Sequence, residues 1–309
     1  MAHLTPSLSV IIPLYNDEEV VFPLFERLHP VLQDIATKFD IIFIDDGSRD
    51  KSWLCVETLR VKHEFVTGIK LSRNFGQQNA ITAGLEHATG DVVVLMDSDL
   101  QDRPEDIPKL ITALLANDTS MAIAKWITRK DSFIKVAASK FFYRVSQKIT
   151  NINHQPNLGV FRAIRKSVVD ELRKYQEKTS TTLSVLYWIG SDYVAVELKR
   201  DERFAGKSGY TIRKMMKLAL DRIFSFSMFP IRLATYIGLS VSVLSFITGF
   251  ILILRRVSGL VAPGWTSIIV MNLFLFGINF FFLGMIGEYI GRTFLEAKQR
   301  PKYIVKKII

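Results

Sequence analysis

Two long uncharged stretches near the C-terminal end constrain the fold most strongly. Residues 233–254 and 266–287 each contain 22 residues without a charged side chain. A helix of that length crosses roughly 30 Å of hydrocarbon, whereas the core of a soluble protein needs neither such length nor such apolarity. The short linker 255–265 predicts that the two spans form a transmembrane hairpin, with both chain ends on one side of the membrane.

Basic residues flank the outer ends of this predicted hairpin. They are Arg213, Lys214, Lys217, Arg222 and Arg232 before it, and Arg292, Lys298, Arg300, Lys302, Lys306 and Lys307 after it. The linker carries only Arg255 and Arg256. Because cytoplasmic flanks of spans carry an excess of Lys and Arg, we expect a multi-pass protein of the cytoplasmic membrane with both termini in the cytoplasm.

The net charge of +10 allows two interpretations, attraction to nucleic acid or to anionic lipid. With spans in the chain we favour lipid and expect no nucleic-acid partner. The N-terminus lacks the charged and apolar regions of a signal peptide, so the N-terminal portion is expected to stay in the cytosol. The single cysteine, Cys55, allows no intrachain disulfide and no Cys-based zinc site, which fits a reducing compartment.

The first 124 residues alternate between short apolar runs and stretches of helical periodicity. Strands are predicted at 8–12, 41–44, 67–71 and 91–96, and helices at 18–39, 52–61, 79–88 and from Pro104 onward. Strands that are apolar throughout and separated by helices indicate a parallel sheet covered on both faces. The fold class is therefore α/β, and a ligand is expected beyond the carboxyl ends of the strands.

Polar residues follow each of the four predicted strands. They are Asn16 and Asp17, Asp45 and Asp46, Arg73 and Asn74, and Asp97 and Asp99. An isolated Asp-x-Asp is more often a solvated strand-end turn, but four polar tips at one sheet edge indicate a site. Two carboxylates there would suit a divalent cation that holds a diphosphate. The absence of Gly-x-Gly-x-x-Gly after the first strand and of a P-loop argues against dehydrogenases and P-loop NTPases.

Further along, the chain becomes basic and aromatic. Residues 133–149 can form an amphipathic helix, either with an ordinary solvated face or facing phosphates or the membrane. A turn into a strand is predicted at 157–162, a helix at 167–174 and a strand at 193–198. The charged segment 199–210 is predicted to be a mobile loop over the site, and 212–228 a basic amphipathic helix in the headgroup region.

Seven motifs, taken together and in order, resemble the bacterial polyprenyl-phosphate glycosyltransferases of glycosyltransferase family 2, the family of bactoprenol glucosyltransferases and dolichol-phosphate mannose synthase. The matching segments are Val10 to Glu18 (VIIPLYNDE), Ile44 to Asp50 (IDDGSRD), Arg73 to Gln77 (RNFGQ), Asp97 to Asp102 (DSDLQD), Arg203 to Ser208 (RFAGKS), Gly287 to Arg292 (GEYIGR) and Arg300 to Tyr303 (RPKY). The resemblance covers nearly the whole chain.

The resemblance implies a GT-A nucleotide-sugar-binding, Rossmann-like domain at 1–210. It is followed by an interfacial helix at 211–230, the hairpin at 231–291 and a basic cytoplasmic tail at 292–309. The implied activity is inverting transfer from a nucleoside-diphosphate sugar, with UDP favoured, to polyprenyl (undecaprenyl) phosphate for cell-envelope glycans. The implied cofactor is Mg²⁺ or Mn²⁺, and relatives form tetramers, which predicts a homo-oligomer. The sugar itself is not identified by any motif.

Site residues follow from the same resemblance. Pro13, Tyr15, Asn16, Glu18, Asp45 and Asp46 would line the base and ribose pocket, and Asp97, Asp99 and Gln101 would hold the metal against the diphosphate. Arg129, Arg203, Lys207 and Ser208 are candidates for the donor diphosphate and the lipid phosphate, although solvated surface bases remain an alternative. The nucleophile would be a phosphate oxygen. Its second pKa of about 6 leaves it largely ionised at pH 7, so no strong general base is demanded.

Two positions depart from the family pattern. The family often has Asp where this chain has Val160, and it commonly has Arg near Trp126. Either change could alter the sugar accepted or lower activity.

Two other functions predict different sequence features. A processive polysaccharide synthase would carry a Gln-x-x-Arg-Trp motif and more spans, and a non-enzymatic membrane partner in glycolipid translocation would be expected to lose Asp97 and Asp99, which are intact.

Overall fold

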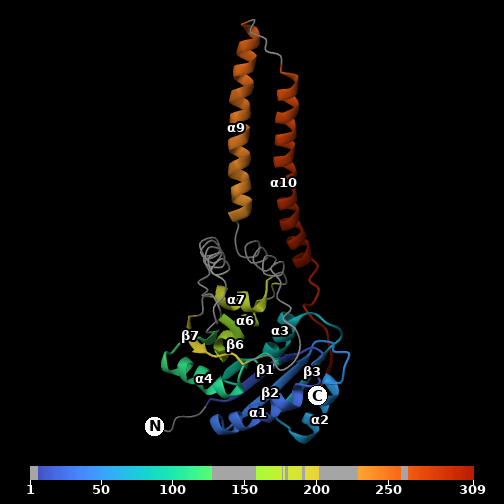
Figure 1. The fold of residues 1–309 in the computed structure, drawn as a ribbon, viewed down its shortest axis with the longest axis vertical. Helices are drawn as coiled ribbons and strands as arrows, with labels where there is room; N and C mark the ends of the chain where they lie inside the picture. The colour runs from blue at the N-terminus through green and yellow to red at the C-terminus, as the bar shows by residue number, and fades with distance from the viewer. Residues whose placement is uncertain are drawn as a thin grey trace. The chain divides into compact units, whose positions relative to one another are not determined.

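The computed structural model describes residues 6–126, 158–175, 177, 180–189, 192–201, 229–258 and 264–309. The chain divides into two compact units, one formed by Met1–Ile212 with Pro301–Ile309 and the other by Arg213–Arg300. Figure 1 shows the ribbon, with the first unit built around a sheet and the second containing two long helices.

The described residues of the first unit form an eight-stranded sheet in the order β7-β5-β6-β4-β1-β2-β3-β8. The strands are β1 (Leu8–Leu14), β2 (Phe39–Asp45), β3 (Val66–Leu71), β4 (Val92–Leu95), β5 (Met121–Trp126), β6 (Leu158–Arg165), β7 (Tyr193–Leu198) and β8 (Val305–Ile308). β4, β1, β2 and β3 pair in parallel, as predicted. The sheet as a whole is mixed, because β6 is antiparallel to β4 and β5, and β8 is antiparallel to β3.

Helices cover both faces of this sheet (Figure 1). They are α1 (Val21–Ile35), α2 (Ser52–Lys62), α3 (Gln77–His87), the 3₁₀ turn η1 (Pro104–Asp106), α4 (Ile107–Ala116), α6 (Lys166–Leu172) and α7 (Thr182–Trp188). All seven residues of β1 are buried, as expected for a strand covered on both sides. One core cluster joins Val10 and Ile12 of β1 to Leu24 of α1 and Leu110 of α4.

The face of the sheet that α3 covers requires a glycine in that helix. A Cβ atom at Gly84 of α3 would lie 2.4 Å from Cγ2 of Ile11, so the helix can approach β1 only without a side chain there. This close approach brings the N-terminal end of α3 to the strand tips, where Gln77 begins the helix. The fold thus places a residue of the predicted motif Arg73 to Gln77 beside the expected site.

Some elements differ from those predicted. β7 has the predicted bounds. The apolar stretch 183–189 is the helix α7, and the side chain of Thr181 accepts a hydrogen bond from the Ser184 amide, as an N-cap does. β5 was missed, since Met121–Trp126 is short and runs into the basic segment. The predicted helices at 133–149 and 212–228 lie outside the described residues.

The second unit contains α9 (Phe229–Val257) and α10 (Trp265–Ala297). Both are long and apolar enough, by length and composition, to cross a membrane, over Ile231–Thr248 and Phe274–Ala297. The predicted spans at 233–254 and 266–287 lie inside these two helices. Two helices joined by a short linker are consistent with the predicted hairpin.

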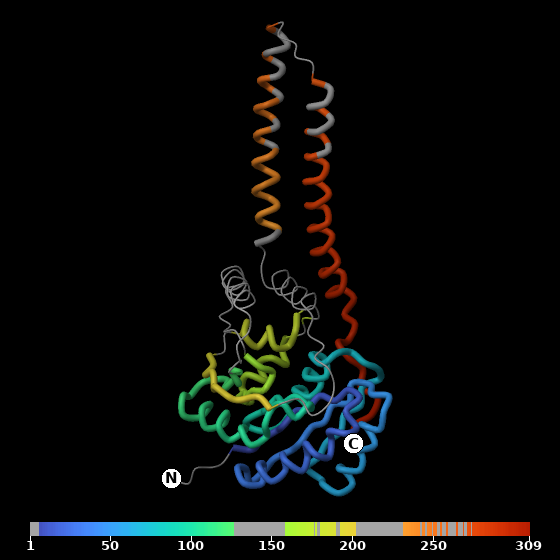
Figure 2. Tube along the Cα trace, viewed as in Figure 1, coloured from blue at the N-terminus to red at the C-terminus, as the bar shows by residue number. Residues whose placement is uncertain are grey.

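The end of the chain differs from the predicted basic tail at 292–309. α10 continues to Ala297, and Val305–Ile308 form β8 at the edge of the sheet. Figure 2 shows this last segment, in red, beside β3. The backbone of an edge strand can pair while its basic side chains stay exposed, so a basic composition does not exclude a strand there.

Candidate active site

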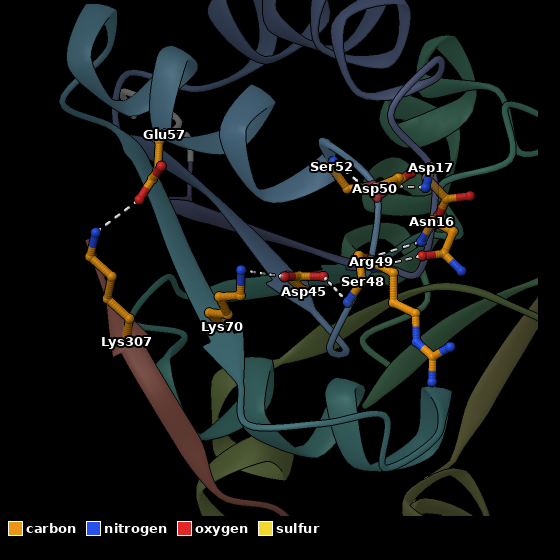
Figure 3. A network of polar contacts seen from close by, with 10 residues as sticks. All are labelled: Asn16, Asp17, Asp45, Ser48, Arg49, Asp50, Ser52, Glu57, Lys70 and Lys307. Atoms are coloured by element: carbon orange, nitrogen blue, oxygen red, sulfur yellow. Dashed lines mark hydrogen bonds and ion pairs between the residues drawn. The ribbon is translucent and has the colours of Figure 1, made fainter.

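The loops that follow β1 and β2 are joined by hydrogen bonds at the carboxyl edge of the sheet (Figure 3). The Asn16 amide donates to Ser48 Oγ at 3.0 Å, and Asn16 Oδ1 accepts from the Arg49 amide at 2.9 Å. The Asp17 amide donates to Ser52 Oγ at 2.8 Å. Asn16 adopts φ 56°, a left-handed conformation that asparagine tolerates well. Two of the predicted strand tips therefore form one structure.

The predicted pocket residues near these loops have different roles. Pro13 is buried within β1, whereas Tyr15 is 45% exposed. Glu18 Oε2 accepts from the Lys51 amide at 2.8 Å and so supports the start of α2. Tyr15 and the edge of the Asn16 loop are thus available to a ligand, while Pro13 and Glu18 shape the loops around it.

Asp45 and Asp46, at the tip of β2, are both buried. Asp46 accepts hydrogen bonds from the Phe75 and Gly76 amides at 2.7 and 2.8 Å, so its carboxylate holds the loop between β3 and α3. Burial raises the pKa of Asp46, against the lowering effect of those two amides. Each Asp46 oxygen accepts one backbone hydrogen bond, which gives this residue a structural role in the loop, and its predicted contact with a ligand stays a prediction.

The two carboxylate oxygens of Asp45 differ in their hydrogen bonds. Its Oδ1 accepts from the Ser48 amide at 2.9 Å. Its Oδ2 is buried, has no hydrogen-bond partner among the described residues, and lies 3.7 Å from Nζ of Lys70. A buried carboxylate oxygen without a donor is a candidate acceptor for a hydroxyl or N–H group of a ligand.

Residues 97–102, which we call the carboxylate turn, follow β4. Asp97 Oδ1 accepts from Gln77 Nε2 at 2.6 Å, and Asp99 Oδ1 accepts from the Gln101 amide at 3.2 Å. Ser98 Oγ donates to Asp17 Oδ2 at 2.8 Å, which links the turn to the loop after β1. The structure thus brings Asp97 and Asp99 to the edge that also carries Asn16 and Asp45, as predicted from the four polar tips.

Asp102 is a third carboxylate of this turn that the sequence analysis did not select. It is fully buried, and its Oδ2 accepts from the Asp97 amide at 3.3 Å. Its Oδ1 has no hydrogen-bond partner among the described residues, and Arg200 Nε lies 3.5 Å away. Burial, followed by the charge of Asp97, raises the pKa of Asp102 to about 7.

The donor set of the carboxylate turn fits a divalent cation shared with a substrate. Among the described residues no group of three or more His, Cys, Asp or Glu is arranged as a metal site. Mg²⁺, however, is commonly bound by one or two carboxylates together with substrate phosphates. Asp97 and Asp99 meet that requirement, and the unpartnered Asp102 oxygen lies in the same turn. Gln101, also predicted as a ligand, donates its Nε2 to the Asp201 carbonyl at 3.3 Å.

A guanidinium group faces these carboxylates. Arg200 Nη2 lies 3.6 Å from Asp97 Oδ2, and the guanidinium lies 5.1 Å from the ring centroid of Trp126. The Trp126 ring is stacked on Phe161 at 6.5 Å between centroids. A Cβ atom at Gly159 would lie 2.5 Å from Nε1 of Trp126, so the indole fits only over a glycine. Trp126, one of the two departures from the family, is thus a platform for Arg200.

The other departure, Val160, lies on β6 near a buried cation. Arg162 is 2% exposed, donates from Nε to the Val160 carbonyl at 3.0 Å and from Nη2 to the Gly159 carbonyl at 2.6 Å. Its guanidinium lies 5.6 Å from the ring centroid of Tyr187. Burial lowers the pKa of Arg162. Because Leu95 pairs with Arg162, continuing the register by two residues would set Val160 across from Asp97.

The remaining predicted residues cannot be placed. Arg129, Arg203, Lys207 and Ser208 lie outside the described residues. Four residues near the site were missed, namely Gln77, Asp102, Arg162 and Arg200. Gln77 and Asp102 stood inside recognised motifs, which was a usable signal. Arg200 lies in the charged segment 199–210 that was predicted to cover the site, and Arg162 follows Val160 by two residues, but only the fold brings β6 and the end of β7 to β4.

This mixed sheet, with carboxylates gathered at the tips of its parallel strands, has the GT-A arrangement of nucleotide-sugar glycosyltransferases, as predicted. Residues 9–173 match the model of Glycosyl transferase family 2. The chain belongs to that family.

Relatives extend the similarity over the full length. The uncharacterized glycosyltransferase YkcC of Bacillus subtilis (strain 168) is 38% identical, with 97% of this chain and 93% of the relative covered. The prophage bactoprenol glucosyl transferase homolog of Escherichia coli (strain K12) is 38% identical, with 97% and 99% covered. A crystal structure of a mycobacterial protein has TM-score 0.50 at 17% identity, covering 71% of this chain and 73% of that one, and shows the fold alone.

Proposed function

We propose that this chain transfers a sugar from a nucleoside-diphosphate sugar, with UDP as the nucleotide, to undecaprenyl phosphate at the cytoplasmic face of the membrane. The observation that carries the proposal is that the carboxylate turn meets the loops after β1 and β2 through Ser98 and Asp17. The name of the Escherichia coli relative, a bactoprenol glucosyl transferase homolog of nearly equal length, supports the acceptor.

The nucleoside would bind over the tips of β1 and β2. Asp45 Oδ2, which lacks a hydrogen-bond donor among the described residues, can accept from a base N–H or a ribose hydroxyl. Tyr15 offers an exposed ring beside it. The diphosphate would then point toward the carboxylate turn, since that turn is joined to the same loop through Asp17.

Two kinds of charge would stabilise the leaving diphosphate. Mg²⁺ or Mn²⁺ held by Asp97 and Asp99 would supply charge neutralisation when bound. Arg200, already facing Asp97, can reach a phosphate by rotation of its side chain and offers paired N–H donors. Arg129, Arg203, Lys207 and Ser208 remain proposed phosphate ligands.

The reaction is a displacement at the anomeric carbon. An acceptor phosphate oxygen forms the new C1–O bond while the bond from C1 to the diphosphate oxygen breaks, and the nucleoside diphosphate leaves with the electron pair. The configuration inverts. Because a phosphate monoester has a second pKa of about 6, the nucleophile is largely ionised at pH 7 and needs no proton removed. Positioning and charge neutralisation would therefore supply most of the rate.

The arrangement of the chain supports a membrane location. The candidate spans of α9 and α10 lie between residues of the first unit, because β8 follows α10 and belongs to the sheet. If both helices cross a bilayer, the chain must return to the side from which it left. The basic residues on the outer flanks favour the cytoplasm for that side.

The test uses the full-length protein in purified membranes with undecaprenyl phosphate and Mn²⁺ or Mg²⁺. A panel of labelled UDP-, GDP- and dTDP-sugars is offered, and lipid-linked product is extracted. We expect product with a UDP-sugar, none after removal of the metal, and none with Asp99→Ala. Absence of product with every donor would refute the transferase activity, whereas full activity of Asp99→Ala would refute only the metal assignment.

A further inference from the structure

The C-terminal strand β8 pairs with the edge of β3 from Gly68 to the end of that strand. Lys70 pairs with Lys307 and Ile69 with Ile308 in register. Gly68 and Ile309 exchange two backbone hydrogen bonds of 3.1 and 2.9 Å, and the Ser72 amide donates to the Ile304 carbonyl at 2.9 Å. The strand therefore fixes β3 from Gly68 up to the residue before Arg73.

The side chain of Ile309 packs in a space left by a glycine on β3. A Cβ atom at Gly68 would lie 2.9 Å from Cγ1 of Ile309 and 2.8 Å from Cγ1 of Val56. Ile309 packs against the hydrophobic core that contains Val56. A glycine on β3 thus makes room for the Ile309 side chain, which defines the register of β8 beyond what backbone pairing alone would set.

Charged and aromatic contacts lead from β8 toward the nucleotide site, and Figure 3 shows the two ion pairs among them, Lys307 with Glu57 and Lys70 with Asp45. Lys307 Nζ lies 2.8 Å from Glu57 Oε1 on α2. Lys307 and Lys70 lie 6.0 and 5.2 Å from the ring centroid of Trp53. The hydrogen bond from Lys307 lowers the pKa of Glu57, so the pair is ionised at neutral pH. The Lys70 ammonium group thus lies over the Trp53 ring, which Lys307 also approaches.

Lys70 in turn faces Asp45. The two residues are partners in the β2–β3 register, and Lys70 Nζ lies 3.7 Å from Asp45 Oδ2. Asp45 is completely buried, and a buried carboxylate needs a cation or hydrogen-bond donors beside it. Without β8, β3 would be an open edge strand and Lys70 could extend into water, since long flexible side chains gain rotamer freedom there.

We propose that β8 is a positioning element of the nucleotide site, which holds Lys70 against Asp45 and thereby fixes the position of the Asp45 carboxylate for the base or ribose of the donor. This proposal rests on the donor site proposed above. It assigns a role to the end of the chain that neither the family match, which ends at residue 173, nor the motifs supply. Donor affinity should consequently depend on the residues that follow the candidate spans.

The test measures UDP binding to the full-length protein in nanodiscs with Mn²⁺, together with KM for the UDP-sugar and for undecaprenyl phosphate. Lys70→Met should raise the UDP Kd roughly tenfold, because it removes the cation facing a buried carboxylate. Lys307→Met should raise it roughly threefold, because it removes the ion pair with Glu57 and so loosens the strand that holds Lys70, while the Lys70 side chain itself is kept. Neither change should alter kcat or the KM for the lipid. Lys70→Arg should restore most of the affinity.

Lys306→Met is the matched control. It removes the same charge one residue away, from an exposed position in β8, and should leave the UDP Kd unchanged. If thermal-shift measurements show that Lys70→Met does not fold, the test rests on Lys307→Met alone. The Lys307 side chain lies at the surface, so its replacement should not prevent folding.

The outcomes separate the two proposals. Failure of the wild-type protein to bind UDP, GDP or dTDP overturns the donor site itself. Wild-type binding with equal affinity in Lys70→Met and Lys307→Met overturns the positioning role and leaves the donor site standing. Equal rises in the KM for the donor and in the KM for the lipid would also overturn it. So would a rise in the UDP Kd of Lys306→Met as large as that of Lys307→Met, because a specific action on Asp45 would produce neither result.

Discussion

Gln77 Nε2 donates a 2.6 Å hydrogen bond to Asp97 Oδ1. The first residue of α3 thereby orients the first carboxylate of the carboxylate turn, although 20 residues separate them. Asp46 holds the loop that precedes Gln77 through the Phe75 and Gly76 amides. The tip of β2 thus holds the loop after β3, and that loop orients Asp97 at the tip of β4. This explains why the motif Arg73 to Gln77 belongs with the Asp-x-Asp in this chain.

We expect Gln77→Ala to lower kcat/KM for the nucleotide-sugar by roughly 10- to 100-fold, the usual effect of removing a partner that orients a metal-binding group. The affinity for Mn²⁺ in the presence of UDP should fall with it, as measured by electron paramagnetic resonance. Gln78→Ala is the control, because its side chain contacts the Leu183 amide rather than the carboxylate turn. Equal losses in the two variants would show a general effect on α3 instead.

Arg200 should compete with the cation for Asp97. With its guanidinium 3.6 Å from Asp97 and 3.5 Å from Asp102, it neutralises part of the charge that attracts a metal. Arg200→Ala should therefore tighten Mn²⁺ binding to the nucleotide-free protein roughly tenfold, since it removes a positive charge at that distance. Free Mn²⁺ is again measured by electron paramagnetic resonance.

The conservative variants refine this prediction. Arg200→Lys keeps the charge but loses the planar stack on Trp126, so it should shift Mn²⁺ affinity less than Arg200→Ala does. Trp126→Leu should resemble Arg200→Lys. Unchanged Mn²⁺ affinity in Arg200→Ala would contradict the competition.

Much of the site could be predicted from sequence because local chemistry marks it. Asp97 and Asp99 end an apolar strand, and parallel pairing with β1 must bring them to the edge that carries Asn16. Arg162 and β8 could not be found that way. Arg162 reaches the site only because β6 is antiparallel to β4, and Val305–Ile308 form a strand only because the edge of β3 is open to it. Contacts between distant segments depend on topology, which periodicity does not encode.

The opposite end of the sheet contains an aromatic cluster that should make stability depend on pH. His29 lies 5.2 Å from the ring of Phe25 and 4.9 Å from that of Phe65, and its buried Nε2 has no hydrogen-bond partner among the described residues. Burial, followed by the charge of His63, lowers the pKa of His29 below 6.5. The folded state therefore resists protonation of this ring.

The lowered pKa of His29 determines how stability changes with pH. Above pH 6.5 the ring is neutral in both the folded and unfolded states, and the apolar cluster is fully stabilising. As the pH falls below 6.5, the unfolded state binds a proton first, so stability falls until the folded pKa is passed. We expect Tm to drop between pH 7 and pH 5, and His29→Phe to reduce that drop. The same drop in His29→Phe would assign the pH dependence to other groups.

Val160 allows a test of whether the reaction needs a base. Continuing the β4–β6 register by two residues would set this residue across from Asp97, and the family resemblance led us to expect Asp there. If the acceptor phosphate is already ionised, Val160→Asp should not raise kcat. It should instead raise the KM for undecaprenyl phosphate by roughly threefold to tenfold, because a further negative charge repels the incoming dianion.

Val160→Asn separates charge from shape, since it has nearly the same size as Asp without the charge, and it should leave the lipid KM close to that of the wild type. The assay compares kcat and lipid KM for the three proteins at fixed saturating donor between pH 6 and pH 8. A tenfold gain in kcat for Val160→Asp, absent in Val160→Asn and growing with pH, would show that a carboxylate base assists the transfer. An unaltered or lower kcat with a higher lipid KM would instead support transfer that depends on positioning and charge neutralisation, because the nucleophile then has no proton to lose.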